Sequence, residues 1–180
     1  MLYRFLLVIL PNPELSEKVK AMRAALYARI GGFSGRNTPP HITLCFLDLP
    51  ETSGSAIMDA IATGTADQSG FALRYKGITH FPDKRTIYID PVEKEAIAAV
   101  RAPIIAALKA HDALRTTVRE TDHPHLTIAA GLKPDKFVKA WDMLAPHELR
   151  RKERVEEVVL LKRLLKPGEQ YECVHSFPFE

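Results

Sequence analysis

The motif Pro40-His41-Ile42-Thr43-Leu44 occurs a second time, 84 residues later, as Pro124-His125-Leu126-Thr127-Ile128. A His-x-Thr triplet alone carries little information, since about 0.4 matches are expected by chance in a chain with this content of histidine and threonine. A preceding proline and a following leucine or isoleucine lower the chance expectation to roughly 0.006 per copy. The repeated motif therefore guides the interpretation of the rest of the chain.

The spacing within each motif indicates a short strand with one polar and one apolar face. In a strand, residues i and i+2 point to the same side, about 6–7 Å apart, whereas residue i+1 points to the other side. His41 and Thr43 therefore share one face, and Ile42 and Leu44 are expected to be buried on the opposite face. The second motif has the same pattern, so each motif presents an imidazole and a hydroxyl on a strand anchored from behind.

Two such strands facing each other across a cleft would bring together His41, His125, Thr43 and Thr127. Near pH 7 one imidazole can be neutral and accept a proton while the other is charged and donates one. Threonine hydroxyls can donate hydrogen bonds to the non-bridging oxygens of a phosphate. The four residues thus predict in-line displacement at phosphorus without a metal, with the histidines as acid and base and the threonines as phosphate ligands.

The flanking sequence predicts an α+β fold with mostly antiparallel strands and helices on one face. Asn12-Pro13 is typical of a helix start, and the apolar residues that follow at helical spacing end at Gly31-Gly32. Pro91 is expected to open a long helix, and Pro103 to kink it. Seven strands are expected at 5–10, 41–47, 71–76, 86–90, 125–130, 157–165 and 171–177, and four helices at 13–30, 55–63, 91–108 and 135–144.

The composition is that of a packed globular protein. The chain has 180 residues, 46% of them hydrophobic and 26% charged, and a net charge of +3 that favours anionic partners only weakly. The apolar run Phe5–Leu10 is too short for a signal peptide or a membrane span. Two cysteines, Cys45 and Cys173, suit free thiols in a reducing compartment, so a cytoplasmic location is expected.

At the motif residues the sequence resembles the two-histidine phosphoesterase superfamily, and within it the 2′-5′ RNA ligase and RNA 2′,3′-cyclic phosphodiesterase branch. The likeness extends over nearly the whole chain and places the family's motif residues on His41, Thr43, His125 and Thr127. It implies one bilobed α+β domain over residues 1–180, whose lobes are not contiguous in sequence. Two mostly antiparallel sheets would be related by pseudo-twofold symmetry, with helices on the outer faces and the active-site cleft between the lobes.

The resemblance also implies metal-independent hydrolysis of a 2′,3′-cyclic phosphate, at an RNA end or in a nucleotide, without a cofactor. His125 is the expected base for the attacking water and His41 the acid for the 2′-oxygen, while Thr43 and Thr127 hold the phosphate. A bell-shaped pH profile is expected, because one histidine must be charged and the other neutral. Two alternatives share the fold: an RNA 2′-5′ ligase and an RNA-binding module without turnover. A monomer is expected in either case.

Two features of the sequence depart from many relatives. Asp48 stands where the first motif often runs on to a glycine, and the second motif is followed by Ala129-Ala130-Gly131 without the basic residue often seen there. A metal site is a further alternative, since Asp122 and His123 adjoin the second motif. Other side chains that could flank the cleft or stack on a base are Lys84, Arg85, Arg115, Arg119, Phe33, Tyr75 and Phe81.

Overall fold

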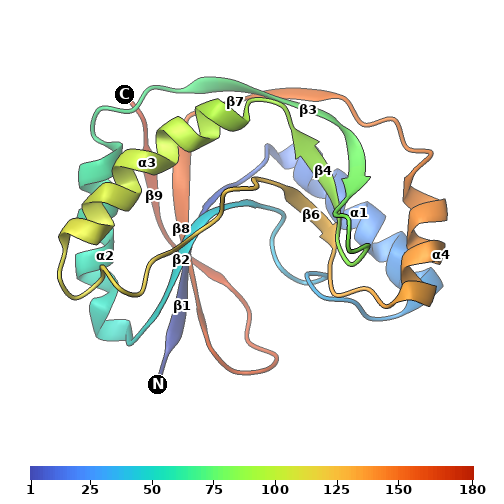
Figure 1. The fold of residues 1–180 in the computed structure, drawn as a ribbon, viewed down its shortest axis with the longest axis horizontal. Coiled ribbons are helices and arrows are strands. Elements are labelled where there is room, and N and C mark those ends of the chain that lie inside the picture. Colours follow the sequence, from blue (N-terminus) through green and yellow to red (C-terminus); the bar gives the residue numbers. More distant parts are fainter.

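The computed structural model describes all residues 1–180 and shows an α+β fold with four α-helices and an antiparallel sheet (Figure 1). The strands are β1 (Tyr3–Ile9), β2 (Ile42–Leu49), β3 (Phe71–His80), β4 (Ile87–Pro91), β5 (Arg119–Glu120), β6 (Leu126–Ala129), β7 (Arg151–Val155), β8 (Glu157–Leu164) and β9 (Glu172–Pro178). The helices are α1 (Pro13–Ile30), α2 (Gly54–Thr65), α3 (Lys94–Ala110) and α4 (Pro134–Leu144), with a short 3-10 turn at Glu51–Ser53.

The strands form one curled sheet in the order β7-β3-β4-β6-β2-β1-β8-β9, and the short β5 pairs with β2. All of the strand pairs are antiparallel. The two four-stranded halves meet at a single register pair, Ile42 opposite Leu126. The two sheets expected from the sequence are therefore the two halves of one sheet, which join where the two motifs lie.

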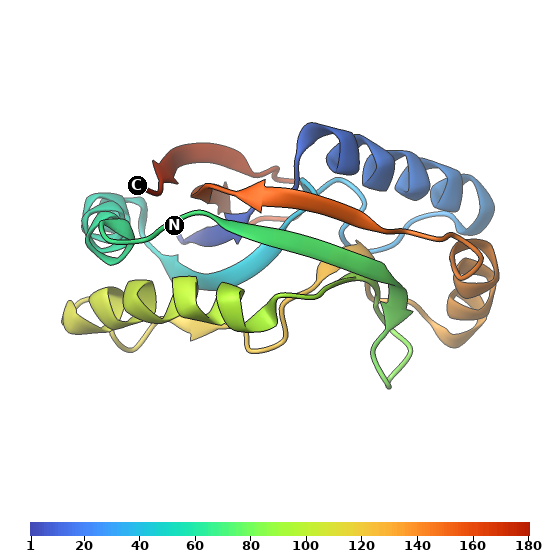
Figure 2. The ribbon, with the colours of Figure 1, turned by 90° about the horizontal axis from the view of Figure 1, so that it is seen from above.

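The helices cover the two halves in pairs. Helices α2 and α3 pack together over the half formed by β1, β2, β8 and β9, while α1 and α4 pack at the other half beside β6 (Figures 1 and 2). The contact between α2 and α3 depends on Gly64, because a Cβ there would lie 2.5 Å from the Cα of Ile104. Each half of the sheet is thus formed by segments that are far apart in the sequence.

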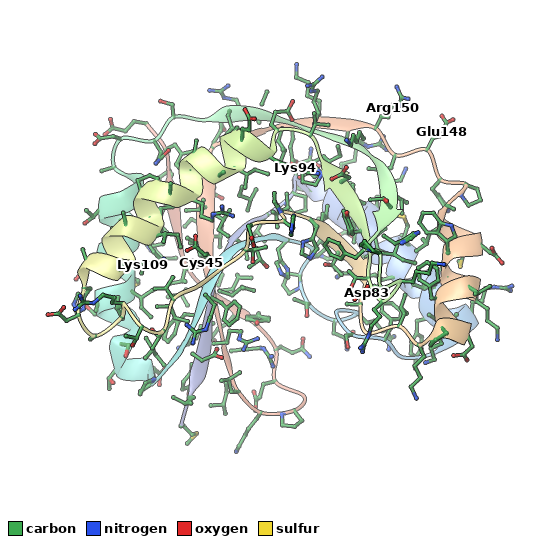
Figure 3. All side chains as sticks on the ribbon, in the orientation of Figure 1. Cys45, Asp83, Lys94, Lys109, Glu148 and Arg150 are labelled. Atoms are coloured by element: carbon green, nitrogen blue, oxygen red, sulfur yellow. The ribbon has the colours of Figure 1, made fainter.

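The core lies between the sheet and its helices. A cluster of 38 buried hydrophobic residues runs through both halves, and it includes the apolar residues of the two motifs. Cys45 belongs to this core (Figure 3), where burial raises the pKa of its thiol to about 12, while Cys173 is exposed. A second, smaller cluster lies on the opposite face of the β1–β8 half and consists of Leu6, Val8, Val159 and Leu161.

The first helix begins as the sequence predicts. The side chain of Asn12 caps it by accepting a hydrogen bond of 2.9 Å from the backbone nitrogen of Leu15. Glu153 of β7 holds the same turn, because its carboxylate accepts hydrogen bonds from the backbone nitrogen of Asn12 and from the hydroxyl of Tyr75. None of the helices is both long enough and apolar enough to cross a membrane.

The start of α3 differs from the prediction. Pro91 ends β4 opposite Tyr75 instead of opening the helix, and the backbone nitrogen of Val92 still donates a hydrogen bond of 2.8 Å to Arg74 in β3. The helix begins only at Lys94 and continues through Pro103. Proline has no N–H group to donate. Neither the end of a strand nor the first turn of a helix requires that donor, so proline is compatible with both positions.

Candidate active site

The two motifs lie side by side at the junction of β2 and β6. Ile42 and Leu126 face each other across the antiparallel pair, and both side chains are fully buried. Continuing this register by one residue to either side places His41 opposite Thr127 and Thr43 opposite His125, with Cβ atoms about 4.5–5.5 Å apart in a regular sheet.

The two histidines are therefore diagonal neighbours on the face turned away from the core, where such neighbours lie about 7–8 Å apart. Each histidine is half-buried, while the apolar residues that follow it in the motif are fully buried. The alternation predicted from the sequence is confirmed in both motifs.

A bulge in β2 changes the alternation beyond Thr43. Leu7 of β1 lies opposite Cys45, whereas the next residue, Val8, lies opposite Thr43, so β2 carries one extra residue at this point. Leu44 and Cys45 are consequently both buried, and Phe46 follows Thr43 onto the open face.

The tautomers of the two histidines are set by their own chain. The Nδ1 atom of His41 lies 2.6 Å from the carbonyl oxygen of Pro39, and the Nδ1 atom of His125 lies 2.6 Å from the carbonyl oxygen of His123. A carbonyl oxygen can only accept, so Nδ1 must carry the hydrogen in both rings. When either ring is neutral, its Nε2 atom therefore holds the free lone pair.

The proline in each motif explains why the same contact forms twice. A residue that precedes proline is confined to extended conformations, and proline itself has a fixed φ angle. Pro40 and Pro124 therefore favour an extended conformation at Pro39 and His123, and both prolines are buried in the protein. We infer that this restriction aims the carbonyl group at the imidazole ring two residues later.

Both imidazoles hold a proton less tightly than a free histidine. Burial lowers the pKa of His41, the carbonyl of Pro39 opposes this shift, and the positive charges of Arg23 and His125 lower the pKa further. Burial also lowers the pKa of His125, the carbonyl of His123 opposes this shift, and the positive charge of His123 lowers the pKa further. The ring of His125 packs edge-on against Phe81 and Tyr88, with ring centres 5.0 and 5.5 Å away.

Arg23 connects the two motifs from behind. It lies on the buried face of α1 with 3% of its surface exposed. Its guanidinium donates hydrogen bonds to the carbonyl oxygens of Thr38, Thr127 (2.7 Å) and Ile128 (3.1 Å). Burial lowers its pKa to about 10, which still leaves it charged at pH 7. A signal for this role exists in the sequence, because Arg23 is a charged residue on the apolar face of the predicted helix.

The histidines line a cleft of about 640 Å³ that also contains Thr43. Thr127 is half-buried beside Gly35, which lies in the loop along the cleft and has a φ angle of +87° that favours glycine. The other residues that line the cleft are Arg4, Leu6, Gly32, Phe33, Arg36, Asn37, Thr38, Phe46, Thr121, Arg163, Gly168, Glu169, Gln170 and Tyr171.

Several residues singled out in the sequence lie elsewhere. Tyr75 is buried and bonded to Glu153, so it is not placed to stack on a base. Lys84 and Arg85 lie on the loop between β3 and β4, directly after Asp83, which Figure 3 labels. No three His, Cys, Asp or Glu side chains gather in an arrangement that could hold a metal ion. The arginines of the cleft are Arg4, Arg36 and Arg163, which the sequence analysis did not identify.

The sequence as a whole matches a protein family. The model of the 2′-5′ RNA ligase superfamily matches residues 11–167, a range that includes both motifs. The chain belongs to the 2′-5′ RNA ligase superfamily. A phosphoesterase-like protein of Shouchella clausii is 29% identical to this chain over 130 residues. The aligned region covers 71% of this chain and 74% of that protein.

Solved structures show that the fold of this superfamily member is shared. TT0787 of Thermus thermophilus superposes with a TM-score of 0.73 at 18% identity, covering 98% of this chain and 97% of that one. LigT of E. coli, solved with 3′-AMP, superposes with a TM-score of 0.62 at 15% identity, covering 98% of both chains. Further LigT structures were solved with phosphate and with ATP. The similarity confirms the α+β fold expected from the sequence.

Proposed function

We propose that this protein is a metal-independent phosphoesterase that hydrolyses 2′,3′-cyclic phosphates at RNA ends or in nucleotides. The observation that carries the proposal is the matched pair of imidazoles, His41 and His125. Each has Nδ1 bonded to the carbonyl of the residue just before its own motif, and each lies on the open face of the sheet. Two such rings on a diagonal leave room for one phosphate between their free Nε2 atoms.

In the reaction, one histidine acts as a base and the other as an acid. A neutral Nε2 takes a proton from the attacking water as its oxygen bonds to phosphorus, and a protonated Nε2 gives a proton to the ribose oxygen whose bond to phosphorus breaks. The product is a phosphate monoester and a free ribose hydroxyl. Thr43 and Thr127 donate hydrogen bonds to the non-bridging oxygens and stabilise the charge that develops there.

We propose His41 as the base, the reverse of the assignment made from sequence. The charges of Arg23 and His125 lower the pKa of His41, and the charge of His123 lowers the pKa of His125. Arg23 is buried whereas His123 is exposed, so solvent screens the charge of Arg23 less. The charge on Arg23 therefore favours a productive form with His41 neutral and His125 charged.

The relatives support this substrate class. The superfamily match and the phosphoesterase-like protein of Shouchella clausii agree with chemistry at a phosphate ester. LigT has been solved with a nucleotide and with phosphate, and it shares this fold over 98% of the chain. The phosphate of such a ligand suits the site between His41 and His125.

We expect turnover of 2′,3′-cyclic nucleotides in the presence of EDTA, because no step above needs a metal ion. The measurement is product formation from 2′,3′-cyclic AMP and from a cyclic-phosphate-ended oligonucleotide, with and without EDTA. The product isomer, 2′- or 3′-phosphate, identifies the ester bond that opens. A folded protein that turns over neither substrate, or that loses activity in EDTA, would contradict the proposal.

The pH profile of kcat/KM is expected to be a bell with its maximum below about pH 6.5, the ordinary pKa of histidine. The productive form has one charged and one neutral imidazole, so it is populated between the two pKa values, and both are lowered. Activity falls at higher pH because the acid loses its proton, and at lower pH because the base becomes protonated. A profile flat from about pH 5 to 9 would count against the histidine pair.

A further inference from the structure

The cleft continues well past the histidines. From Thr43 it runs over the face of β2, β1 and β8 to the loop between β8 and β9, whose residues Gly168 to Tyr171 form its far wall. Its floor here includes Leu6 and Phe46, which pack with the smaller apolar cluster. This part of the cleft also contains two arginines, Arg4 and Arg163, which differ in their hydrogen-bond and ion-pair partners.

Arg4 already has a carboxylate partner. Its Nε atom donates to one oxygen of Asp48 at 2.8 Å and a terminal nitrogen donates to the other at 2.7 Å, so the pair is bidentate. The guanidinium also lies 4.3 Å from the centre of the Phe46 ring. The hydrogen bonds to Asp48 raise the pKa of Arg4 and lower the pKa of Asp48. The local charge of this pair is therefore balanced.

Arg163 has no such partner. It takes part in none of the close ion pairs of the protein, and its Nε atom is buried without a hydrogen-bond acceptor. Its guanidinium lies 5.1 Å from the centre of the Tyr171 ring. The residue itself is half-buried and lines the cleft, so its terminal guanidinium nitrogens can donate hydrogen bonds to an anion there. The far end of the cleft thus contains a cation without a salt bridge beside an aromatic ring. Two carboxylates lie near it: Asp48, whose pKa the charge of Arg163 lowers but which is bonded to Arg4, and Glu169 on the far wall of the cleft.

This cation is too far from the histidines to bind the same phosphate. Thr43 pairs with Val8, and Arg163 pairs with Arg4, four residues further along β1 and two strands away from β2. With standard strand dimensions, the Cα atoms of Thr43 and Arg163 are about 16 Å apart. The intervening floor is apolar, and the partly buried rings of Phe46 and Tyr171 border it, where a nucleoside can contact them.

We propose that Arg163 binds a second phosphate of the substrate, upstream of the cyclic end, and that Tyr171 and Phe46 contact the nucleoside between the two phosphates. The proposal rests on the proposed function and makes it more specific. The preferred substrate is an RNA strand that has at least one phosphodiester before its terminal cyclic phosphate. A cyclic mononucleotide occupies only the part of the cleft next to the histidines.

The experiment compares a dinucleotide ending in a 2′,3′-cyclic phosphate with the cyclic mononucleotide, using wild type, Arg163→Gln and Lys166→Gln. Lys166 is an exposed residue of the same hairpin outside the cleft, so its replacement removes the same charge without touching the subsite. Arg163→Gln is expected to raise KM for the dinucleotide about tenfold to a hundredfold and to leave kinetics on the mononucleotide unchanged. Lys166→Gln should match wild type on both substrates.

Two results would contradict the proposed subsite. Arg163→Gln could lose activity equally on both substrates, or it could retain full activity on both. Hydrolysis of the mononucleotide by wild type tests the proposed function separately. Binding tests the subsite without turnover, by titration of wild type and Arg163→Gln with a dinucleotide 3′-monophosphate and with 3′-AMP. Arg163→Gln should bind the dinucleotide less tightly than wild type does and should bind 3′-AMP equally well. The slope of log Kd against log salt concentration for the dinucleotide should be smaller by about 0.7 in Arg163→Gln, because one phosphate contact is lost. Equal binding of the dinucleotide by both proteins would contradict the subsite.

Discussion

Replacing His41 or His125 with alanine is expected to lower kcat on 2′,3′-cyclic AMP by about 10²–10⁴-fold in each case. General acid or base catalysis by a positioned histidine contributes about this much, and each ring supplies one of the two proton transfers. Each motif contains no titratable side chain besides its histidine, so no other group of the motif can substitute for the missing Nε2. The double variant should be barely slower than either single variant, because residues that act as a unit are not additive.

The pH profiles of the two variants test which histidine is the base. In His41→Ala the residual activity should no longer rise with pH on the acid side, because the group that must lose a proton is gone. In His125→Ala the fall on the basic side should disappear, since the acid is gone. The reverse pattern would restore the assignment made from sequence, and an unchanged bell in both variants would exclude the histidine pair.

His123→Ala is the matched control. This histidine is exposed, lies two residues from His125 and contributes its backbone carbonyl, which the substitution retains. Its kcat should stay within about twofold of wild type. A loss comparable to that in His125→Ala would show that the imidazole of His123 takes part in the reaction and would argue for the metal-site alternative. Thermal unfolding of all variants would separate loss of chemistry from loss of fold.

The sequence predicts the helices and most strands well because their patterns are local. Buried residues alternate in the motif strands and recur at helical spacing in α1, so burial and secondary structure can be derived together. Strand β7 was missed because Arg151–Val155 is a charged segment at the sheet edge with one buried residue, Val155. Edge strands tolerate such charge and lose the apolar alternation that reveals inner strands.

The candidate site also combines features that the local sequence predicts with features that it does not. The positions of His41 and Thr43 on one face depend on adjacent residues, and the period of a strand predicts them. Three other features depend on contacts between distant segments: the pairing of Ile42 with Leu126, the bulge at Leu44 and the position of Arg163 in the cleft. No local pattern specifies which strands become neighbours, so these features become visible only in the structure.

Arg23 is expected to have the largest effect on stability among the residues near the site. Replacing it with methionine should lower the free energy of unfolding by about 2–5 kcal/mol, because three backbone carbonyls lose their donor and a buried acceptor without a partner costs about 1–3 kcal/mol. Chemical denaturation measures the change. Arg29→Met, an exposed arginine on the same helix, is the control and should differ from wild type by less than about 0.5 kcal/mol.

The same substitution should change the titration of His41. The positive charge of Arg23 disfavours the protonated ring and lowers its pKa, so removing the charge should raise the pKa of His41 and shift the acid limb of the kcat/KM profile to higher pH. Arg23→Lys keeps the charge but cannot reproduce the three-way hydrogen bonding of the guanidinium. It should therefore lower stability while leaving the pKa of His41 near its wild-type value.

Nuclear magnetic resonance titration of the imidazole signals in wild type, Arg23→Met and Arg23→Lys separates the two effects. An equal rise in the pKa of His41 in both variants would mean that loss of packing, which opens the ring to water, causes the shift. A rise only in Arg23→Met would mean that the charge causes it, and the helix α1 would then have two roles. Its apolar face stabilises the half of the sheet that carries β6, and its one buried charge disfavours the protonated form of His41.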